Sequence, residues 1–278
     1  MPDNAKPSFF FSRDLLDARA AKLADEYQNA SPFPHIVIDD FLPREMIDAV
    51  LEEFPKPQDL DWQRFDSRAE VKLASNDESR MGPTTRNLLA QFNSSAICGF
   101  LEKLTGIEAL VPDPHFVGGG LHQIQPGGFL KVHADFNWHD RLRLYRRLNL
   151  LLYLNDDWRE EYGGHLELWD RDMKKCARRV LPVANRCVVF STTSTSYHGH
   201  PLPLMCPEGR TRKSMALYYY SSERDDQIEA DAHSTLFQVR PESTDKPAPV
   251  TARQFVRAHA PPFLVRGLRA IRRRIRGR

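Results

Sequence analysis

The chain has 278 residues, of which 41% are hydrophobic and 27% are charged, a composition typical of a folded globular protein. Its formal net charge of +2 is too small to indicate a highly charged partner for the whole chain, and no run of about 18 apolar residues indicates a membrane span. The N-terminus lacks the basic-then-apolar order of a signal peptide. The four cysteines form no CxxC pair, so we expect reduced thiols and a cytoplasmic location.

Residues 1–109 form a predicted N-terminal support region of helices and a strand. Apolar side chains recur at helical spacing over residues 13–28, which predicts a helix. The stretch "HIVIDDFL" (35–42) predicts a short buried strand. A second helix is expected over residues 43–54, with a proline at each end.

The remainder of this region contains one polar segment and one apolar segment. Residues 56–85 are polar and rich in turn-forming residues, so we expect a flexible insertion there. Residues 86–106 have a helical pattern that predicts a single helix ending at Gly106.

From residue 110 the sequence changes to short runs of β-type composition that are separated by turn residues. No helical segment is evident between these runs, which favours a sandwich or barrel. We expect a jelly-roll (double-stranded β-helix) domain over residues 110–222, so that the fold class is mainly β with flanking helices (α+β). Residues 223–278 are expected to form a linker and a basic tail.

The segment "KVHADF" contains a histidine and an aspartate two residues apart, His133 and Asp135. In a strand such side chains project from the same face, so they can reach one metal ion together. His198, which follows the apolar strand "CVVFS", is the clearest third ligand. Two histidines and one carboxylate leave open positions on the metal, an arrangement that suits non-haem Fe(II). An HxD pair by itself is more often a polar strand edge.

The strand "RKSMALYYYS" begins with Arg212 and places Ser214 on the same face. An iron enzyme with a dicarboxylate cosubstrate needs a cation for the distal carboxylate, and the planar guanidinium matches a carboxylate with two hydrogen bonds. The alternative is an ordinary arginine at a strand edge.

With these residues in place, the segment from about 115 to 222 resembles the Fe(II)/2-oxoglutarate-dependent oxygenases of the prolyl 4-hydroxylase-like branch. The matching stretches, in chain order, are "QPGGFLKVHADF", "LNLLLYLNDDW", "YGGHLELWD", "RCVVFS", "SYHGHP" and "RKSMALYYY".

The resemblance implies a role for each matching residue. His133, Asp135 and His198 correspond to the iron ligands and catalytic centre. Arg212 corresponds to the residue that binds the C5 carboxylate of 2-oxoglutarate, and Tyr153 to a tyrosine that assists it. The remaining cosubstrate positions are Asn149, where relatives often have a threonine, Ser214, and Gln123, where relatives can have a tyrosine.

Four further histidines compete for roles near this centre. His200 is a rival to His198 as a ligand, but the distance from Phe190 in the family pattern selects His198. His122 and His139 flank the centre, as substrate contacts or as polar loop residues. His165 replaces a residue that is often acidic in relatives, and no role is assigned to it.

The resemblance implies a dioxygenase that hydroxylates an unactivated C–H bond of a prolyl residue or a small molecule. Its cofactors would be Fe(II), 2-oxoglutarate and O2, with ascorbate as reductant, and its coproducts succinate and CO2. One alternative is a non-catalytic jelly-roll binding protein that is attached to a membrane or to nucleic acid through its basic tail. Another is a metal-dependent isomerase or zinc hydrolase, against which Arg212 and Tyr153 argue because neither chemistry needs a dicarboxylate clamp.

The C-terminal stretch 261–278, "PPFLVRGLRAIRRRIRGR", contains seven arginines and no acidic residue. Its leucines and isoleucines have the spacing of a basic amphipathic helix. Such a helix binds an anionic membrane surface or nucleic acid, or it packs on the barrel with one solvated face.

Overall fold

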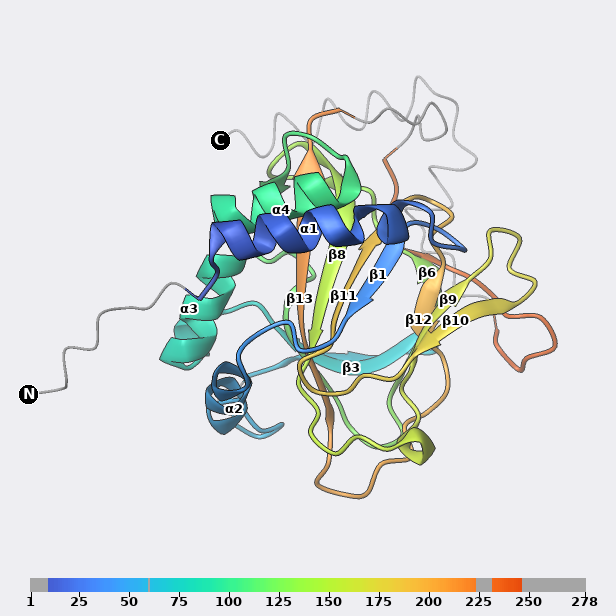
Figure 1. The fold of residues 1–278 in the computed structure, drawn as a ribbon. Coiled ribbons are helices and arrows are strands. Elements are labelled where there is room, and N and C mark those ends of the chain that lie inside the picture. Colours follow the sequence, from blue (N-terminus) through green and yellow to red (C-terminus); the bar gives the residue numbers. More distant parts are fainter. Residues whose placement is uncertain (1–9, 60, 224–231, 247–278) are drawn as a thin grey trace, which may run out of the picture. The chain divides into compact units, whose positions relative to one another are not determined.

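The strands of this chain form one antiparallel sheet that curls into a jelly roll (Figure 1). The computed structural model describes residues 10–59, 61–223 and 232–246, so the basic tail lies outside the described residues. No helix in the described ranges is long and apolar enough to cross a membrane. Up to Asp245 the described residues form one compact unit. The predicted α+β class with a jelly-roll core is confirmed.

The main path of the sheet runs in the order β1-β11-β8-β13-β5-β3-β6-β12-β9-β10. β1 and β3 come from the predicted N-terminal region, yet they pair with strands of the predicted jelly-roll domain. The strands are β1 (His35–Ile38), β2 (Gln63–Asp66), β3 (Glu70–Ser75), β4 (Val111–Pro112), β5 (Gly120–Ile124), β6 (Phe129–Ala134), β7 (Trp138–His139), β8 (Leu144–Tyr153), β9 (Leu166–Trp169), β10 (Cys176–Val180), β11 (Cys187–Ser191), β12 (His198–His200), β13 (Arg212–Ser221) and β14 (Leu236–Phe237).

The helices lie against one outer face of the sheet, where α1 and α4 cross over β13, β8, β11 and β1 (Figure 1). The predicted helix 13–28 is confirmed, and the second begins at Arg44. The helices are α1 (Arg13–Gln28), α2 (Arg44–Glu52), α3 (Pro83–Phe92) and α4 (Ser95–Thr105), with short 3-10 turns η1 (Glu78–Arg80) and η2 (Glu160–Tyr162).

The single helix predicted over residues 86–106 is wrong, because the segment folds as the two helices α3 and α4. The break falls at Ser94, whose backbone is extended and whose carbonyl accepts the first hydrogen bond of α4 from Cys98 N at 3.0 Å. Serine at such a position favours the start of a helix over its continuation. The predicted end is confirmed, since Gly106 has a φ of +73°.

The flexible insertion predicted for residues 56–85 is also wrong, because this segment contains β2, β3 and the turn η1. β3 pairs with β5 on one side and with β6 on the other, which satisfies its backbone polar groups. The polar side chains that suggested a loop, Glu70 and Lys72, face an internal cavity rather than solvent.

The apolar run in β8 follows from burial on both faces of the strand. Leu148, Leu150 and Leu152 pack into the core under the helices. Asn149 and Leu151 alternate with them and face the interior of the barrel, where they line the cavity.

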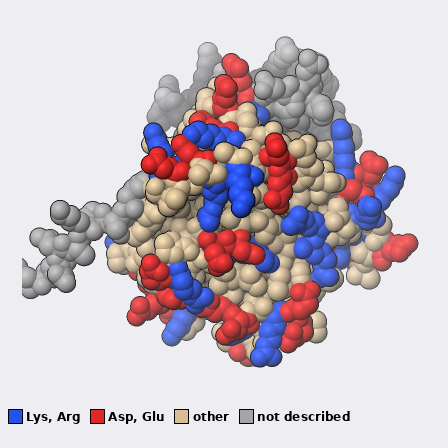
Figure 2. All heavy atoms as spheres, viewed as in Figure 1, with Lys and Arg blue, Asp and Glu red and all other residues tan. Residues whose placement is uncertain are grey.

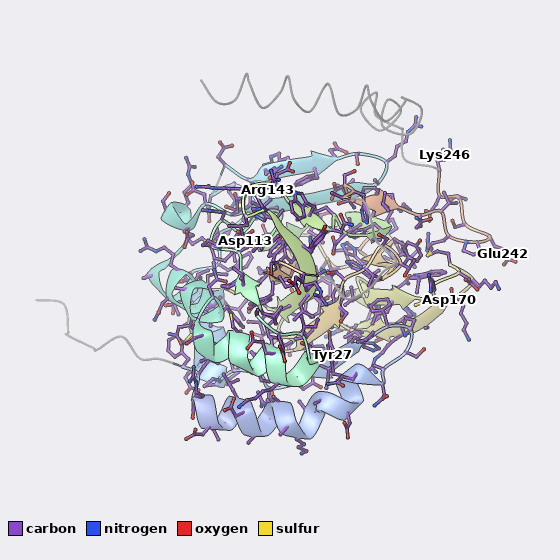
Figure 3. All side chains as sticks on the ribbon, turned by 90° about the horizontal axis from the view of Figure 1, so that it is seen from above. Tyr27, Asp113, Arg143, Asp170, Glu242 and Lys246 are labelled. Atoms are coloured by element: carbon purple, nitrogen blue, oxygen red, sulfur yellow. The ribbon has the colours of Figure 1, made fainter. Side chains whose placement is uncertain are left out.

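Polar contacts also join the helices to the sheet. The hydroxyl of Tyr27, near the end of α1, lies 2.7 Å from Ser191 Oγ at the end of β11 (Figure 3). On the face seen in Figure 2, acidic and basic side chains are interspersed, in keeping with the small net charge.

The loop after β1 is fixed by Asn185. Its amide accepts a hydrogen bond from Leu42 N at 2.9 Å and donates one to Leu42 O at 2.7 Å. Asn185 is 4% exposed and has a φ of +63°, which asparagine tolerates better than alanine. We predict that Asn185→Ala lowers the free energy of unfolding by about 3 kcal/mol, because two buried backbone groups lose their partner.

Urea denaturation measures this change, with Asn29→Ala as the control because the Asn29 amide hydrogen bonds at an exposed position. A loss below about 1 kcal/mol for Asn185→Ala would show that the loop is held by other contacts.

Candidate active site

Two of the three predicted metal ligands are brought together by one strand pair. In the antiparallel pairing of β6 with β12, His133 and His198 are direct partners, and their ring centroids lie 4.5 Å apart. Asp135 follows the end of β6. All three side chains line a cavity of about 310 Å³ inside the barrel, and their potential ligand atoms lie within 4.8 Å of one another.

The orientation of both rings fits a metal ion. His133 Nδ1 lies 2.8 Å from Lys131 O and His198 Nδ1 lies 2.9 Å from Ser196 O, so each Nδ1 carries the hydrogen that it donates. Each Nε2 therefore presents a lone pair to Asp135, at 3.5 Å from Oδ1 and 3.4 Å from Oδ2 respectively. Three electron-pair donors that converge with no hydrogen between them favour a shared cation.

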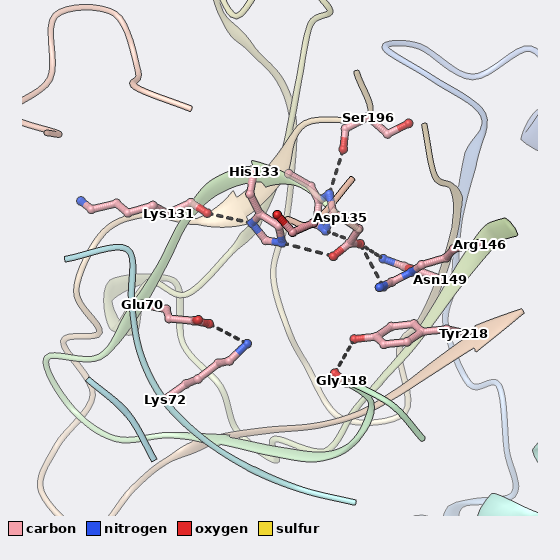
Figure 4. A network of polar contacts seen from close by, with 12 residues as sticks. Glu70, Lys72, Gly118, Lys131, His133, Asp135, Arg146, Asn149, Ser196 and Tyr218 are labelled. Carbon is pink, nitrogen blue, oxygen red and sulfur yellow. Dashed lines mark hydrogen bonds and ion pairs between the residues drawn. The ribbon is translucent and has the colours of Figure 1, made fainter. Parts of the chain in front are cut away.

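The carboxylate of Asp135 is held from behind by Asn149 and Arg146 (Figure 4). Asn149 Nδ2 donates to Asp135 Oδ2 at 2.7 Å, and an Arg146 guanidinium nitrogen lies 3.0 Å from the same oxygen. Burial acts to raise the pKa of Asp135, but the charge of Arg146 holds it well below its usual range. Asp135 is therefore an anion with one oxygen engaged by the protein and the other directed at His133.

Arg146 is a site residue that the sequence pattern missed. It is 1% exposed, it donates twice to Asn149 Oδ1, and its guanidinium lies 3.4 Å from the centroid of the Tyr218 ring. Strict alternation along β8 would place Arg147 in the cavity instead. The register with β13 skips Arg147, since Tyr219 pairs with Leu148 and Tyr220 with Arg146. This bulge turns Arg146 inward.

Arg212 provides a cation at another part of the same cavity. It is 5% exposed and has no acidic partner in the described ranges. Its Nε donates to Gly164 O at 2.8 Å, and one terminal nitrogen lies 3.3 Å from Tyr153 Oη. Burial lowers the pKa of Arg212, so its charge favours an anionic ligand. Gly164 has a φ of +72°, and a Cβ there would lie 2.6 Å from Leu204 Cδ2 and 3.0 Å from Arg212 Cδ, so this position favours glycine.

The other predicted cosubstrate residues are placed differently from one another. Ser214 lines the cavity and pairs across the sheet with Tyr153. Asn149 also lines it, but its amide is engaged by Asp135 and Arg146. Gln123 is not brought to the cavity. Its amide points toward Pro55 O at 3.4 Å, because it is Ile124, one residue later in β5, that faces inward.

The competing histidines separate into two groups. His200 and His122 line the cavity. His139 is buried beneath it, with Nδ1 accepting from Leu142 N and Nε2 lying 3.3 Å from Asp113 Oδ2. His165 lies 2.8 Å from Glu160 Oε1 and contacts Arg179, away from the cavity. His139 and His165 therefore have structural partners.

The outer wall of the cavity comes from the hairpin β2–β3 and from β14. Lys72 Nζ lies 2.9 Å from Glu70 Oε2 and 4.9 Å from the centre of the Phe65 ring, and Figure 4 shows this ion pair across the cavity from the histidines. Phe237 of β14 lies 5.5 Å from the His133 ring. The segment once expected to be flexible therefore contributes part of the cavity wall.

The sequence model of the 2OG-Fe(II) oxygenase superfamily matches residues 119–220. This range contains the two histidines, the carboxylate and the arginine that converge in the cavity. Residues 119–220 are therefore similar to the 2OG-Fe(II) oxygenases, a superfamily of enzymes. No curated protein sequence matches the chain.

Solved structures share the fold. A prolyl-4-hydroxylase from Pseudomonas putida is 20% identical with a TM-score of 0.52, over 72% of this chain and 98% of that chain. A prolyl hydroxylase from Trichoplax adhaerens, in complex with a hypoxia inducible factor peptide fragment, is 17% identical with a TM-score of 0.54, over 75% and 92%. A prolyl 4-hydroxylase from Phytophthora capsici is 21% identical with a TM-score of 0.51, over 80% and 69%. The resemblance to the prolyl 4-hydroxylase-like fold is confirmed.

We predict that Asn149→Ala raises the dissociation constant for Mn²⁺ about tenfold, because Asp135 loses a donor that orients it. The substitution removes no charge, but it also removes the acceptor of two Arg146 hydrogen bonds, so the effect reports how this pair together orients Asp135. Calorimetric titration measures it, and Asn76→Ala, at an exposed position of the cavity wall, is the matched control. Equal affinities for wild type and Asn149→Ala would mean that Arg146 suffices to position the carboxylate.

A second prediction concerns pH. Burial and the charge of Lys72 lower the pKa of His122 from 6.5 to about 3. Because the folded pKa lies below the unfolded one, this group's contribution to stability is complete above pH 6.5 and is lost as pH falls toward 3. The stability of metal-free wild type should therefore fall more steeply below pH 6.5 than that of His122→Leu. Urea denaturation at several pH values measures both slopes, and parallel slopes would contradict the prediction.

Proposed function

We propose that this protein is an Fe(II)- and 2-oxoglutarate-dependent dioxygenase that hydroxylates an unactivated C–H bond, with succinate and CO2 as coproducts. The observation that carries the proposal is that one cavity contains both a set of metal-ligating atoms and a buried arginine, and each favours a bound partner of opposite charge. Three ligand atoms converge with no hydrogen between them at one part, and the buried Arg212 has no acidic partner in the described residues at another.

In this proposal each side chain has a defined task. The Nε2 atoms of His133 and His198 and one oxygen of Asp135 hold the iron. Arg212, with Tyr153 and Ser214 beside it, holds the distal carboxylate of 2-oxoglutarate. When bound together, iron, 2-oxoglutarate and O2 supply the oxidising chemistry, and the protein positions the reactants and excludes water.

The substrate would enter beside Phe136, Tyr218 and Phe237, which surround the triad with apolar surface. A cavity of about 310 Å³ is at the small end of ligand sites. This supports a small molecule, or a single side chain such as a prolyl residue presented by a protein. The fold-level likeness to prolyl hydroxylases is compatible with the second.

Other parts of the proposal rest on the sequence. Ascorbate is proposed as the reductant that maintains Fe(II). A cytoplasmic location is proposed because the sequence favours reduced thiols. Attachment to an anionic membrane or to nucleic acid through residues 261–278 remains a proposal about residues outside the described part of the chain.

We predict that purified protein with Fe(II), ascorbate and O2 converts 2-oxoglutarate to succinate slowly, and faster when a substrate is present. His133→Ala should remove this turnover, because one ligand is lost. Succinate is quantified by mass spectrometry. If wild type and His133→Ala produce equal succinate, the enzyme proposal fails and a non-catalytic binding protein becomes the better account.

A further inference from the structure

His200 is a buried side chain whose hydrogen-bonding groups are unused. It lies at the end of β12, two residues after His198, and is 4% exposed. Neither ring nitrogen has a hydrogen-bond partner in the described part of the chain. A buried polar group without a partner is unfavourable, so such a ring in a cavity wall indicates a ligand that satisfies it.

The position of His200 indicates which ligand this is. The ring lines the same cavity as the triad and Arg212. His200 follows His198 by two residues in β12, and both side chains line this cavity. A dicarboxylate that bridges the metal and Arg212 would pass beside it.

An imidazole at this place has at least one N–H group, whichever nitrogen carries the hydrogen. The N–H has no protein acceptor among the described residues, whereas a carboxylate supplies several. We propose that His200 is a further cosubstrate-binding residue, which donates a hydrogen bond to the distal carboxylate of 2-oxoglutarate beside Arg212. This inference rests on the proposed function and extends it.

His122 provides a contrast in the same cavity. Of its two ring nitrogens only Nε2 is buried without a hydrogen-bond partner, whereas in His200 both are. Only in His200 does the N–H group lack a protein partner whichever nitrogen carries the hydrogen. The two histidines thus differ in whether the N–H group lacks a protein partner, which is the property that the proposal requires.

The test is calorimetric titration of 2-oxoglutarate into the Mn²⁺-loaded full-length protein without oxygen. We expect His200→Leu to raise the dissociation constant about tenfold or more, because a hydrogen bond to a charged group is lost. His200→Gln, which keeps a donor, should remain within about threefold of wild type. His122→Leu makes the same change at the same cavity and should remain within about twofold.

Melting temperature and Mn²⁺ affinity verify that each variant is folded, and His200→Val replaces His200→Leu, with the same criterion, if the leucine variant is not. The inference is overturned if the variant without His200 binds 2-oxoglutarate within about twofold of wild type, or if His122→Leu loses as much affinity. A wild-type protein that binds Mn²⁺ but no 2-oxoglutarate would instead overturn the proposed function.

Discussion

The pairing of β6 with β12 is the constraint on which the active site depends. It places His133 opposite His198, so that two imidazole rings from distant parts of the chain meet at a single point. The carbonyl groups of Lys131 and Ser196 then fix both rings in the same tautomer. A shift of this register by one residue would turn His198 out of the cavity. The hydrogen bonds of the sheet therefore position the two histidine side chains independently of a bound metal.

The charges in the cavity explain why this arrangement needs both a bound cation and a bound anion. Arg146 compensates Asp135 only from one side, at Oδ2, and leaves Oδ1 facing an imidazole lone pair. Arg212 lies elsewhere in the same cavity without an acidic partner in the described ranges. A cation at the triad and a dianion that reaches Arg212 satisfy both sites together. In the proposed function, an iron ion and a dicarboxylate would meet these two electrostatic requirements.

Much of this site could be predicted because strand periodicity fixes which side chains share a face. The HxD spacing and the shared face of Arg212 and Ser214 follow from that period. Arg146 could not be found in this way, because the bulge at Arg147 reverses the alternation. Gln123 was predicted to contact the cosubstrate, but Ile124, the next residue in β5, faces the cavity instead.

In the polar segment before α3, the local composition itself was misleading. Glu70 and Lys72 suggested a solvated loop, but they are polar because they face a cavity, while the backbone of β3 is paired on both sides. The break at Ser94 depended on one residue within an otherwise helical pattern. Local composition could not distinguish a polar interior from solvent, since that difference is created by strands that are distant in sequence.

The most direct test of this account is the coupling between metal and cosubstrate. Calorimetry measures the affinity of wild-type protein for 2-oxoglutarate with and without saturating Mn²⁺, in the absence of oxygen. If the triad and Arg212 form one site, the metal should tighten 2-oxoglutarate binding by at least about tenfold, because the ligand then contacts both. Equal affinity under the two conditions would show that the cation and the anion do not share this cavity, and would contradict the account.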